Sequence, residues 1–214
     1  MKLVGLFASI VLLVSAYAAY REAAPFLTGG MTARDVTENG GGAGVFGISS
    51  YSQRLALDQC RESLLSVAAS LRPANERQAA AKTCETMARD ILQRNPADAY
   101  AATILAAAGF AEGNPEMARR SYRLSWQIAP NEFWLGALRL DLARDHILPD
   151  AGDLAGVVES DLMLHGRSQN GRVILAHWYL QDPAARKILA GTLDRLPEND
   201  KAAFLDVVYS LNAE

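Results

Sequence analysis

The chain has 214 residues, of which 50% are hydrophobic and 21% are charged, a balance typical of one ordered domain with an appendage. Its formal net charge of −3 excludes a general electrostatic attraction to nucleic acid or to anionic lipid. The two cysteines, Cys60 and Cys84, form neither a CxxC motif nor a Cys/His ligand spacing. The sequence therefore predicts no structural zinc site.

An uncharged apolar run covers residues 3–20, directly after Lys2. At about 1.5 Å per helical residue it crosses most of a ~30 Å hydrocarbon core. Ala16-Tyr17-Ala18 fits a signal-peptidase site, which favours a cleaved signal peptide. The length of the run favours a retained membrane anchor instead, and so do Tyr17 and Tyr20, which suit an interfacial aromatic belt. Both alternatives export the rest of the chain.

The sequence divides into three segments: a transmembrane anchor or signal peptide over 1–21, a Gly-rich linker over 22–50 and a helical domain over 51–214. The glycines of the linker predict a flexible tether. Residues 42–47 formally match GxGxxG, but no strand precedes them, so we regard the match as accidental. As an alternative to a free tether, apolar linker residues could dock on the first helix pair: Val45, Phe46 and Ile48.

From Tyr51 onward, apolar residues recur at helical spacing without strand-like alternation, which predicts an all-α domain. We expect a loop over 146–153 and a polar turn over 166–171. The first helix is expected to bury Leu57 and Leu71, among other leucines. The expected helices cover 52–71, 76–94, two within 95–130, 133–145, 154–164, 172–180, 184–195 and 199–211.

Export also favours a disulfide between Cys60 and Cys84. Antiparallel helices that turn at residues 73–75 place the two cysteines at comparable distances from the turn. Such offsets permit a bridge across the hairpin, and two buried thiols remain the alternative.

Residues 95–130 contain a helical hairpin that turns at Gly113-Asn114-Pro115. Pro96 and Pro130 lie 34 residues apart, which is the period of a tetratricopeptide repeat. The segment resembles that family, or the related Sel1 type, although Ala102 and Gly109 replace an expected tryptophan and tyrosine. The resemblance covers one repeat and implies a short α-solenoid of antiparallel hairpins. It rests on five further positions: Leu105, Ala106, Ala118, Tyr122 and Ser125.

The resemblance also implies a partner groove lined by first-helix positions, suited to an apolar peptide or helix. Alternatively, the same side chains pack on a neighbouring hairpin or on the linker. The groove positions are Tyr100, Thr103, Ala107, Phe110, Trp134, Ala137, Asp141 and Arg144.

Three arginines on the second helix of the repeat, Arg119, Arg120 and Arg123, suggest either a site for an acidic partner or polysaccharide, or a solubilising face. His146 and His165 are expected at loops or helix ends and His177 in the core, without metal.

No nucleophile, base and orienting group can be named from motifs, and Glu159 with Asp161 is expected on a solvated face. We therefore expect a non-catalytic, cofactor-free adaptor on the periplasmic side of a bacterial inner membrane. Its partner would be another envelope protein or peptide segment, with polysaccharide synthesis or export as one such assembly. The alternatives are a soluble periplasmic protein and a secreted enzyme acting on cell-wall glycan.

Overall fold

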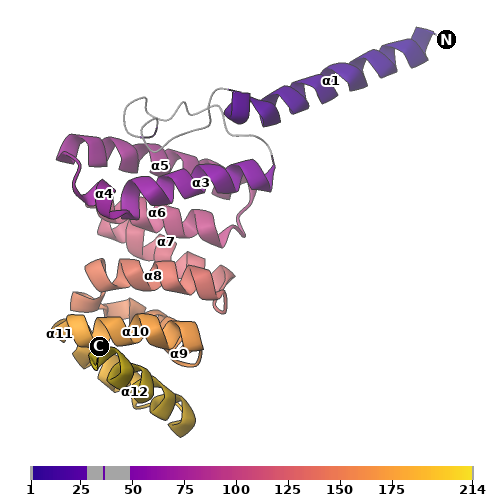
Figure 1. The fold of residues 1–214 in the computed structure, drawn as a ribbon. Helices are drawn as coiled ribbons and strands as arrows, with labels where there is room; N and C mark the ends of the chain where they lie inside the picture. The colour runs from indigo at the N-terminus through magenta and orange to yellow at the C-terminus, as the bar shows by residue number, and fades with distance from the viewer. Residues whose placement is uncertain (1, 28–35, 37–48, 214) are drawn as a thin grey trace. The chain divides into compact units, whose positions relative to one another are not determined.

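A computed structural model of the chain describes residues 2–27, 36 and 49–213. In this part of the chain the fold is entirely α-helical, with 11 α-helices and no strand, which confirms the predicted class (Figure 1). The chain divides into two compact units. Unit 1 comprises Met1–Pro96 with Ile104–Ala118, and unit 2 comprises Ala97–Thr103 with Arg119–Glu214.

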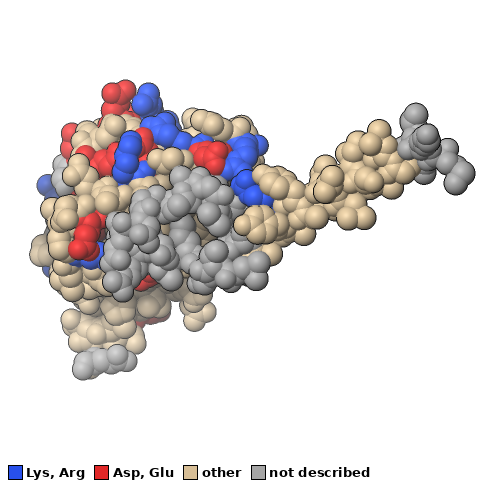
Figure 2. Space-filling model, turned by 90° about the horizontal axis from the view of Figure 1, so that it is seen from above, with Lys and Arg blue, Asp and Glu red and all other residues tan. Residues whose placement is uncertain are grey.

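The first helix, α1, runs from Lys2 to Leu27 and so continues past the predicted end of the anchor at residue 21. Within it, Gly5–Ala23 is a 19-residue segment long and apolar enough to cross a membrane, and none of its apolar window is buried. Figure 2 shows this helix as a surface almost free of charged side chains. The structure thus confirms an amino-terminal helix fit for a membrane span or a signal sequence.

Most of the predicted linker over 22–50 lies outside the described residues. The GxGxxG match and the docking candidates Val45, Phe46 and Ile48 lie there as well. Among the described residues of this segment, Val36 is fully buried.

The first hairpin of unit 1 consists of α3 (Ser50–Leu65), α4 (Val67–Ser70) and α5 (Ala74–Arg94), with α3 packed on α5 (Figure 1). The single helix predicted over 52–71 is wrong, because Ser66 adopts an extended backbone and starts α4. Its hydroxyl accepts a hydrogen bond from the backbone N–H of Ala69 at 3.0 Å. Leu71, predicted to be buried, is 82% exposed as a consequence.

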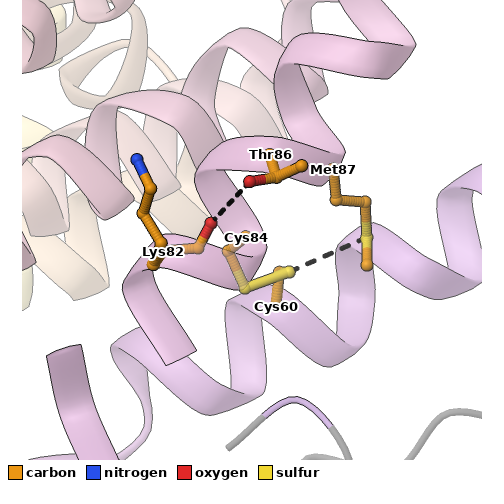
Figure 3. Close-up of a disulfide and its surroundings, with 5 residues drawn as sticks. All are labelled: Cys60, Lys82, Cys84, Thr86 and Met87. Atoms are coloured by element: carbon orange, nitrogen blue, oxygen red, sulfur yellow. Dashed lines mark hydrogen bonds between the residues drawn. A yellow bond between two sulfur atoms is a disulfide. The ribbon is translucent and has the colours of Figure 1, made fainter. Parts of the chain in front are cut away.

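A disulfide joins Cys60 on α3 to Cys84 on α5, with the two Cα atoms 5.6 Å apart, as the sequence predicted (Figure 3). Both cysteines are fully buried, and Met87 packs beside them with its sulfur 3.9 Å from that of Cys60. The α3–α5 pair is therefore fixed covalently at the centre of an apolar contact.

The second hairpin consists of α6 (Ala99–Ala111) and α7 (Pro115–Ile128), and both helices contribute to both units. Gly113 takes a φ of 72° in the turn, and the side chain of Asn114 accepts from the backbone N–H of Met117 at 3.1 Å. A Cβ atom on Gly109 would lie 2.9 Å from the backbone nitrogen of Ala118. The close approach of the helices thus explains why glycine stands where a tyrosine was expected.

Unit 2 continues with helices that pack in sequence, α8 on α9, α9 on α10, and α10 on both α11 and α12. The loop expected over 146–153 contains two 3-10 turns, and α10 starts earlier than predicted because Ser168 caps it. The last helix buries Phe204 and Val208, as expected. The elements are α8 (Phe133–His146), η1 (Leu148–Asp150), η2 (Gly152–Leu154), α9 (Ala155–Gly166), α10 (Gln169–Gln181), α11 (Pro183–Leu193) and α12 (Glu198–Asn212).

Candidate functional site

The predicted groove residues of α8 share one face of the helix, because their spacing of three to four residues follows its turns. Trp134 is half-buried, and its ring meets that of Tyr100 edge-on with 5.0 Å between ring centroids. Tyr100 itself is only 6% exposed, so a buried ring holds the partly exposed Trp134 in place. Ala137 and Asp141 follow along the helix, and Asp141 is exposed.

Thr103 does not belong to an exposed lining. Its side chain is fully buried, donates to the backbone carbonyl of Ala99 at 2.9 Å and lies 2.7 Å from the hydroxyl of Ser125. In unit 1, Ala107 is buried and Phe110 is half-buried. Of the predicted positions in unit 2, the surface therefore retains Trp134, Ala137, Asp141 and Arg144, which we call the α8 face.

Arg144, at the carboxyl end of the α8 face, lies over the indole of Trp178, with 5.3 Å between the guanidinium carbon and the ring centroid. It also donates to the carboxylate of Asp145 at 2.9 Å. Although Asp141 as a residue is exposed, neighbouring protein atoms partly desolvate its carboxyl and so raise its pKa, and the positive charge of Arg144 opposes that shift. The α8 face thus combines a supported aromatic ring at one end with a cation and acidic groups at the other.

Arg119 and Arg123 hold a loop of their own chain, which neither interpretation of the arginine cluster foresaw. Both guanidinium groups donate to the carboxylate of Asp153, and that of Arg119 reaches the acid at 2.5 Å. Arg119 also donates to the backbone carbonyls of Asp150 at 3.1 Å and Ala151 at 2.7 Å. The pair thus ties α7 to the two 3-10 turns, and an acidic partner would have to displace Asp153.

The largest fully buried side chain of the described chain is an arginine, Arg139 on α8. Its Nε and Nη2 donate to the two carboxylate oxygens of Asp161 on α9, at 2.8 and 2.7 Å. Both side chains are 0% exposed. Nη1 donates to the hydroxyl of Ser125 at 3.2 Å and Nη2 to the carbonyl of Ala129 at 3.3 Å. A bidentate ion pair therefore joins α8 to α9 inside unit 2, and the hydrogen bond to Ser125 connects the same guanidinium to α7.

His165 lies beside the Arg139–Asp161 pair, and its ring stacks on that of Phe133 with centroids 4.3 Å apart. Its Nδ1 donates to the carbonyl of Asp161 at 2.9 Å, which leaves Nε2 unprotonated and buried, with no hydrogen-bond partner among the described residues. A Cβ atom on Gly136 would lie 2.9 Å from the imidazole Cε1, so only glycine lets α8 come this close. Burial lowers the pKa of His165, and the carbonyl and carboxylate of Asp161 oppose this.

Tyr122 belongs to the same cluster of buried polar side chains: its ring is fully buried, and its hydroxyl has no hydrogen-bond partner in the described part of the chain. Burial raises the pKa of this phenol well above its usual value, and the nearby carboxylate of Asp161 adds to the rise. The phenol is therefore neutral at any ordinary pH. The buried polar cluster consists of Thr103, Tyr122, Ser125, Arg139, Asp161 and His165.

Two sequence predictions for this region are wrong, and a third is correct in position alone. Asp161 was expected on a solvated face, yet it is fully buried, because Arg139 supplies a counter-charge from 22 residues away. His165 lies in the last turn of α9, as expected for a helix end, but its side chain is fully buried. His177 was expected in the core, but it is exposed, and Trp178 is the buried neighbour. A usable signal existed: Arg139 lies on the stripe of Leu135 and Leu142, where a charge demands a buried partner.

The carboxylates of unit 1 include one pair whose pKa values shift in opposite directions. Burial and the neighbouring Glu85 raise the pKa of Glu112, whereas hydrogen bonds from Lys82 and Arg89 lower that of Glu85. Such a split is typical of acid–base pairs. Glu85, however, is only 8% exposed and holds Lys82 and Arg89 at 2.5 and 2.8 Å, so it is occupied as a structural ion-pair partner.

Within the residues that the structure describes, no group of three or more His, Cys, Asp or Glu side chains is arranged to hold a metal ion. Comparison with protein-family models, with curated proteins and with solved structures finds no match to this chain.

Proposed function

We propose that the protein is a membrane-anchored adaptor whose helical domain binds another envelope protein on the extracytoplasmic side of a bacterial inner membrane. The observation that carries the proposal is the pairing of an uncovered apolar helix with a disulfide-bonded domain. None of the apolar window in Gly5–Ala23 is buried by the part of the chain that the structure describes, so a lipid environment is the natural cover.

The disulfide supports the location of the domain on the extracytoplasmic side of the membrane. Structural disulfides persist in oxidising compartments and are rare in the reducing cytosol. Cys60 and Cys84 are joined, and Lys2 precedes the apolar segment, which favours an amino terminus left inside. The carboxyl-terminal domain would then lie in the periplasm.

Retention of the anchor is favoured over cleavage by the course of α1. The helix continues without a break through Ala16-Tyr17-Ala18 to Leu27, and Glu22, beyond that site, hydrogen-bonds to Ser52 of the domain at 2.7 Å. Cleavage after Ala18 would leave this contact on a short stub. In the proposal, α1 stays attached and raises the local concentration of the domain near a membrane partner.

The α8 face is the proposed partner surface. Trp134 is supported by Tyr100 and partly exposed, a combination that suits an interface anchor, because aromatic side chains dominate the binding energy of many interfaces. Asp141 and Arg144 would orient a partner segment that presents charge of both signs. The tetratricopeptide-like solenoid that the sequence suggests would make this partner a peptide or a helix. An assembly for polysaccharide synthesis or export is one that such an adaptor would serve.

Two experiments test the proposal. Alkaline phosphatase fused after residue 213 should be active only if the domain is exported, and an inactive fusion paired with a fluorescent cytosolic fusion contradicts the topology. For binding, Trp134→Ala should abolish crosslinked recovery of a membrane partner while the helical circular dichroism is kept. Tyr209→Ala, an exposed aromatic on α12, is the matched control. Equal recovery by both variants contradicts the α8 face.

A second candidate is a secreted enzyme acting on cell-wall glycan, favoured only by the opposite pKa shifts of Glu85 and Glu112. A Glu112→Gln variant would abolish glycan cleavage if Glu112 were the general acid. We rank this candidate lower because Glu85 is buried against its two basic partners.

A further inference from the structure

The carboxyl end of α1 is hydrogen-bonded to the amino-terminal end of α3, although the two sites are 27 to 30 residues apart in sequence. The carboxylate of Glu22 accepts from the backbone N–H of Ser49 at 3.1 Å, from the hydroxyl of Ser49, and from the hydroxyl of Ser52 at 2.7 Å. Ser49 is the N-cap of α3, since its hydroxyl also accepts from the backbone N–H of Ser52 at 3.2 Å. A negative charge is favourable at this end of a helix.

The position of Glu22 along α1 sets the depth at which this contact occurs. The apolar span ends at Ala23, and a carboxylate is costly within the hydrocarbon core, so Glu22 belongs to the headgroup layer. Tyr17 and Arg21 support that depth, because the guanidinium donates to the Tyr17 hydroxyl at 3.2 Å and both groups suit the interface. The hydrogen bonds to Glu22 therefore bring the first turn of α3 to the same layer.

Tyr51 lies between the two serines that bind Glu22, and it is turned outward. It is 64% exposed, whereas Ser52 and Gln53 beside it are at most 9% exposed. Consecutive Cα atoms are about 3.8 Å apart, so the backbone of Tyr51 lies within a few ångström of the level fixed by Ser52, whatever the direction of α3. A tyrosine, with an apolar ring and a polar tip, is a preferred side chain at the boundary between lipid and water.

We propose that Tyr51 is a second membrane contact: the first turn of α3, held by Glu22, rests in the headgroup layer of the phospholipid bilayer that α1 spans. The occupant of this surface is the bilayer itself, because the hydrogen bonds of Glu22 tie the surface to the end of the span. The inference rests on the proposed membrane anchoring. It adds that the domain is held on the membrane at two points and not by α1 alone.

The test uses the full chain in nanodiscs of phosphatidylcholine and phosphatidylglycerol, with a fluorescent bimane attached to a single introduced cysteine. No described cysteine is free, because Cys60 and Cys84 are bonded to each other, so the new thiol alone reacts. The labelled variants are Tyr51→Cys, Leu12→Cys in the middle of the span, and Val67→Cys as the control, since Val67 is 80% exposed in the same unit, beyond the opposite end of α3. Quenching by lipids with a nitroxide at the headgroup or deep in the acyl chain reports the depth of each label.

We expect the deep nitroxide to quench the label at position 12, and the headgroup nitroxide to quench the label at 51 at least threefold more than that at 67. Equal quenching at 51 and 67, with position 12 still quenched, overturns the second contact and leaves the anchor intact. An unquenched position 12 overturns the anchoring itself. Adding Glu22→Ala to Tyr51→Cys should reduce the quenching at 51 to the control level, and unchanged quenching contradicts the role of Glu22.

Discussion

The α3–α5 pair of unit 1 and the α8–α9 pair of unit 2 are each held together by one strong interaction, but the two interactions are of different kinds. Each is a pair of helices packed through a buried seam, and each seam carries one strong link. In α3–α5 the link is the Cys60–Cys84 disulfide among apolar side chains. In α8–α9 it is the Arg139–Asp161 ion pair within the buried polar cluster.

The difference lies in what each link responds to. A disulfide stabilises mainly by restricting the unfolded chain and is broken only by reduction, so the α3–α5 pair depends on the compartment. A buried ion pair adds little net stability but is costly to break, since a lone charge would remain without water. The α8–α9 pair therefore depends on pH and on the identity of a few side chains.

The largest effect is expected when the ion pair is broken from one side. Arg139→Met leaves the carboxylate of Asp161 buried without its counter-charge, and such losses cost about 3–5 kcal/mol of unfolding free energy. Urea denaturation followed by circular dichroism measures the change. Arg144→Met on the same helix is the matched control, because its partner Asp145 is solvent-exposed and such pairs contribute about 1 kcal/mol or less.

A double variant sharpens this prediction. Arg139→Met combined with Asp161→Leu removes both charges and should recover most of the lost stability, because an apolar replacement of a buried pair is often neutral. A double variant as unstable as Arg139→Met alone would show that the hydrogen bonds to Ser125 and Ala129, and not the charges, carry the cost.

The second effect concerns the covalent link. Cys60 and Cys84 are 24 residues apart, and a loop of this size corresponds to about 3 kcal/mol in the chain-entropy model. Cys60→Ala with Cys84→Ala should lower the unfolding free energy by about that amount. Dithiothreitol should destabilise the native chain similarly and leave the double variant unaffected. Sensitivity of the double variant to the reductant would contradict the assignment.

The sequence was sufficient to predict the all-α class and the positions of most helices, because helical periodicity and capping residues act locally. The apolar spacing predicted the helix over 133–145, observed as Phe133–His146, and the turn residues Gly113-Asn114-Pro115 predicted the connection between α6 and α7. The break at Ser66 was missed, since a serine within an apolar pattern forms either a cap or a helical residue according to its tertiary surroundings. The disulfide was predictable because the expected export of the chain favours one and because the two cysteines lie at comparable distances from the connection between their helices.

The candidate site was less predictable, because its contacts join residues far apart in the chain. Arg119 and Arg123 meet Asp153 across 30 to 34 residues, and Arg139 meets Asp161 across 22. Nothing in local spacing specifies these pairings. Thr103 was predicted on a binding surface from its place in a repeat, yet Ser125 draws its hydroxyl into the core.

The third effect is a dependence of folding stability on pH, which we expect from the α8–α9 pair through His165. His165 is buried as the neutral imidazole, and burial lowers its pKa, so the unfolded chain binds a proton more readily than the folded chain. Stability should therefore fall as the pH drops below about 6.5, the usual histidine value, and through the lower folded pKa. The charged groups that face this ring are Asp161 and Arg139, and they act in opposite directions.

The test compares urea unfolding of the native chain and of His165→Gln between pH 7.5 and 5. The native chain should lose more stability over this interval than the variant, and the difference isolates His165 from the carboxylates. His177→Gln is the control, because His177 is exposed. A native chain and His165→Gln variant with parallel pH profiles would mean that a buried water or a shift of Asp161 accommodates the imidazolium.

The smallest effect concerns the surface ion pairs of Asp153 with Arg119 and Arg123. Asp153 receives hydrogen bonds from Arg119 and Arg123, which lower its pKa, so its contribution is present at neutral pH and is lost as the pH falls through the lowered value. The side chain of Asp153 is 57% exposed, so water replaces the ion pairs when they are removed. Asp153→Asn should leave global unfolding almost unchanged and accelerate amide hydrogen exchange in residues 148–154, because the two 3-10 turns lose their tie to α7.

Asp145→Asn, which removes an exposed ion pair on α8, should leave that exchange at its native rate. If Asp153→Asn instead destabilised the protein as much as Arg139→Met, burial would not be the property that separates the two kinds of ion pair.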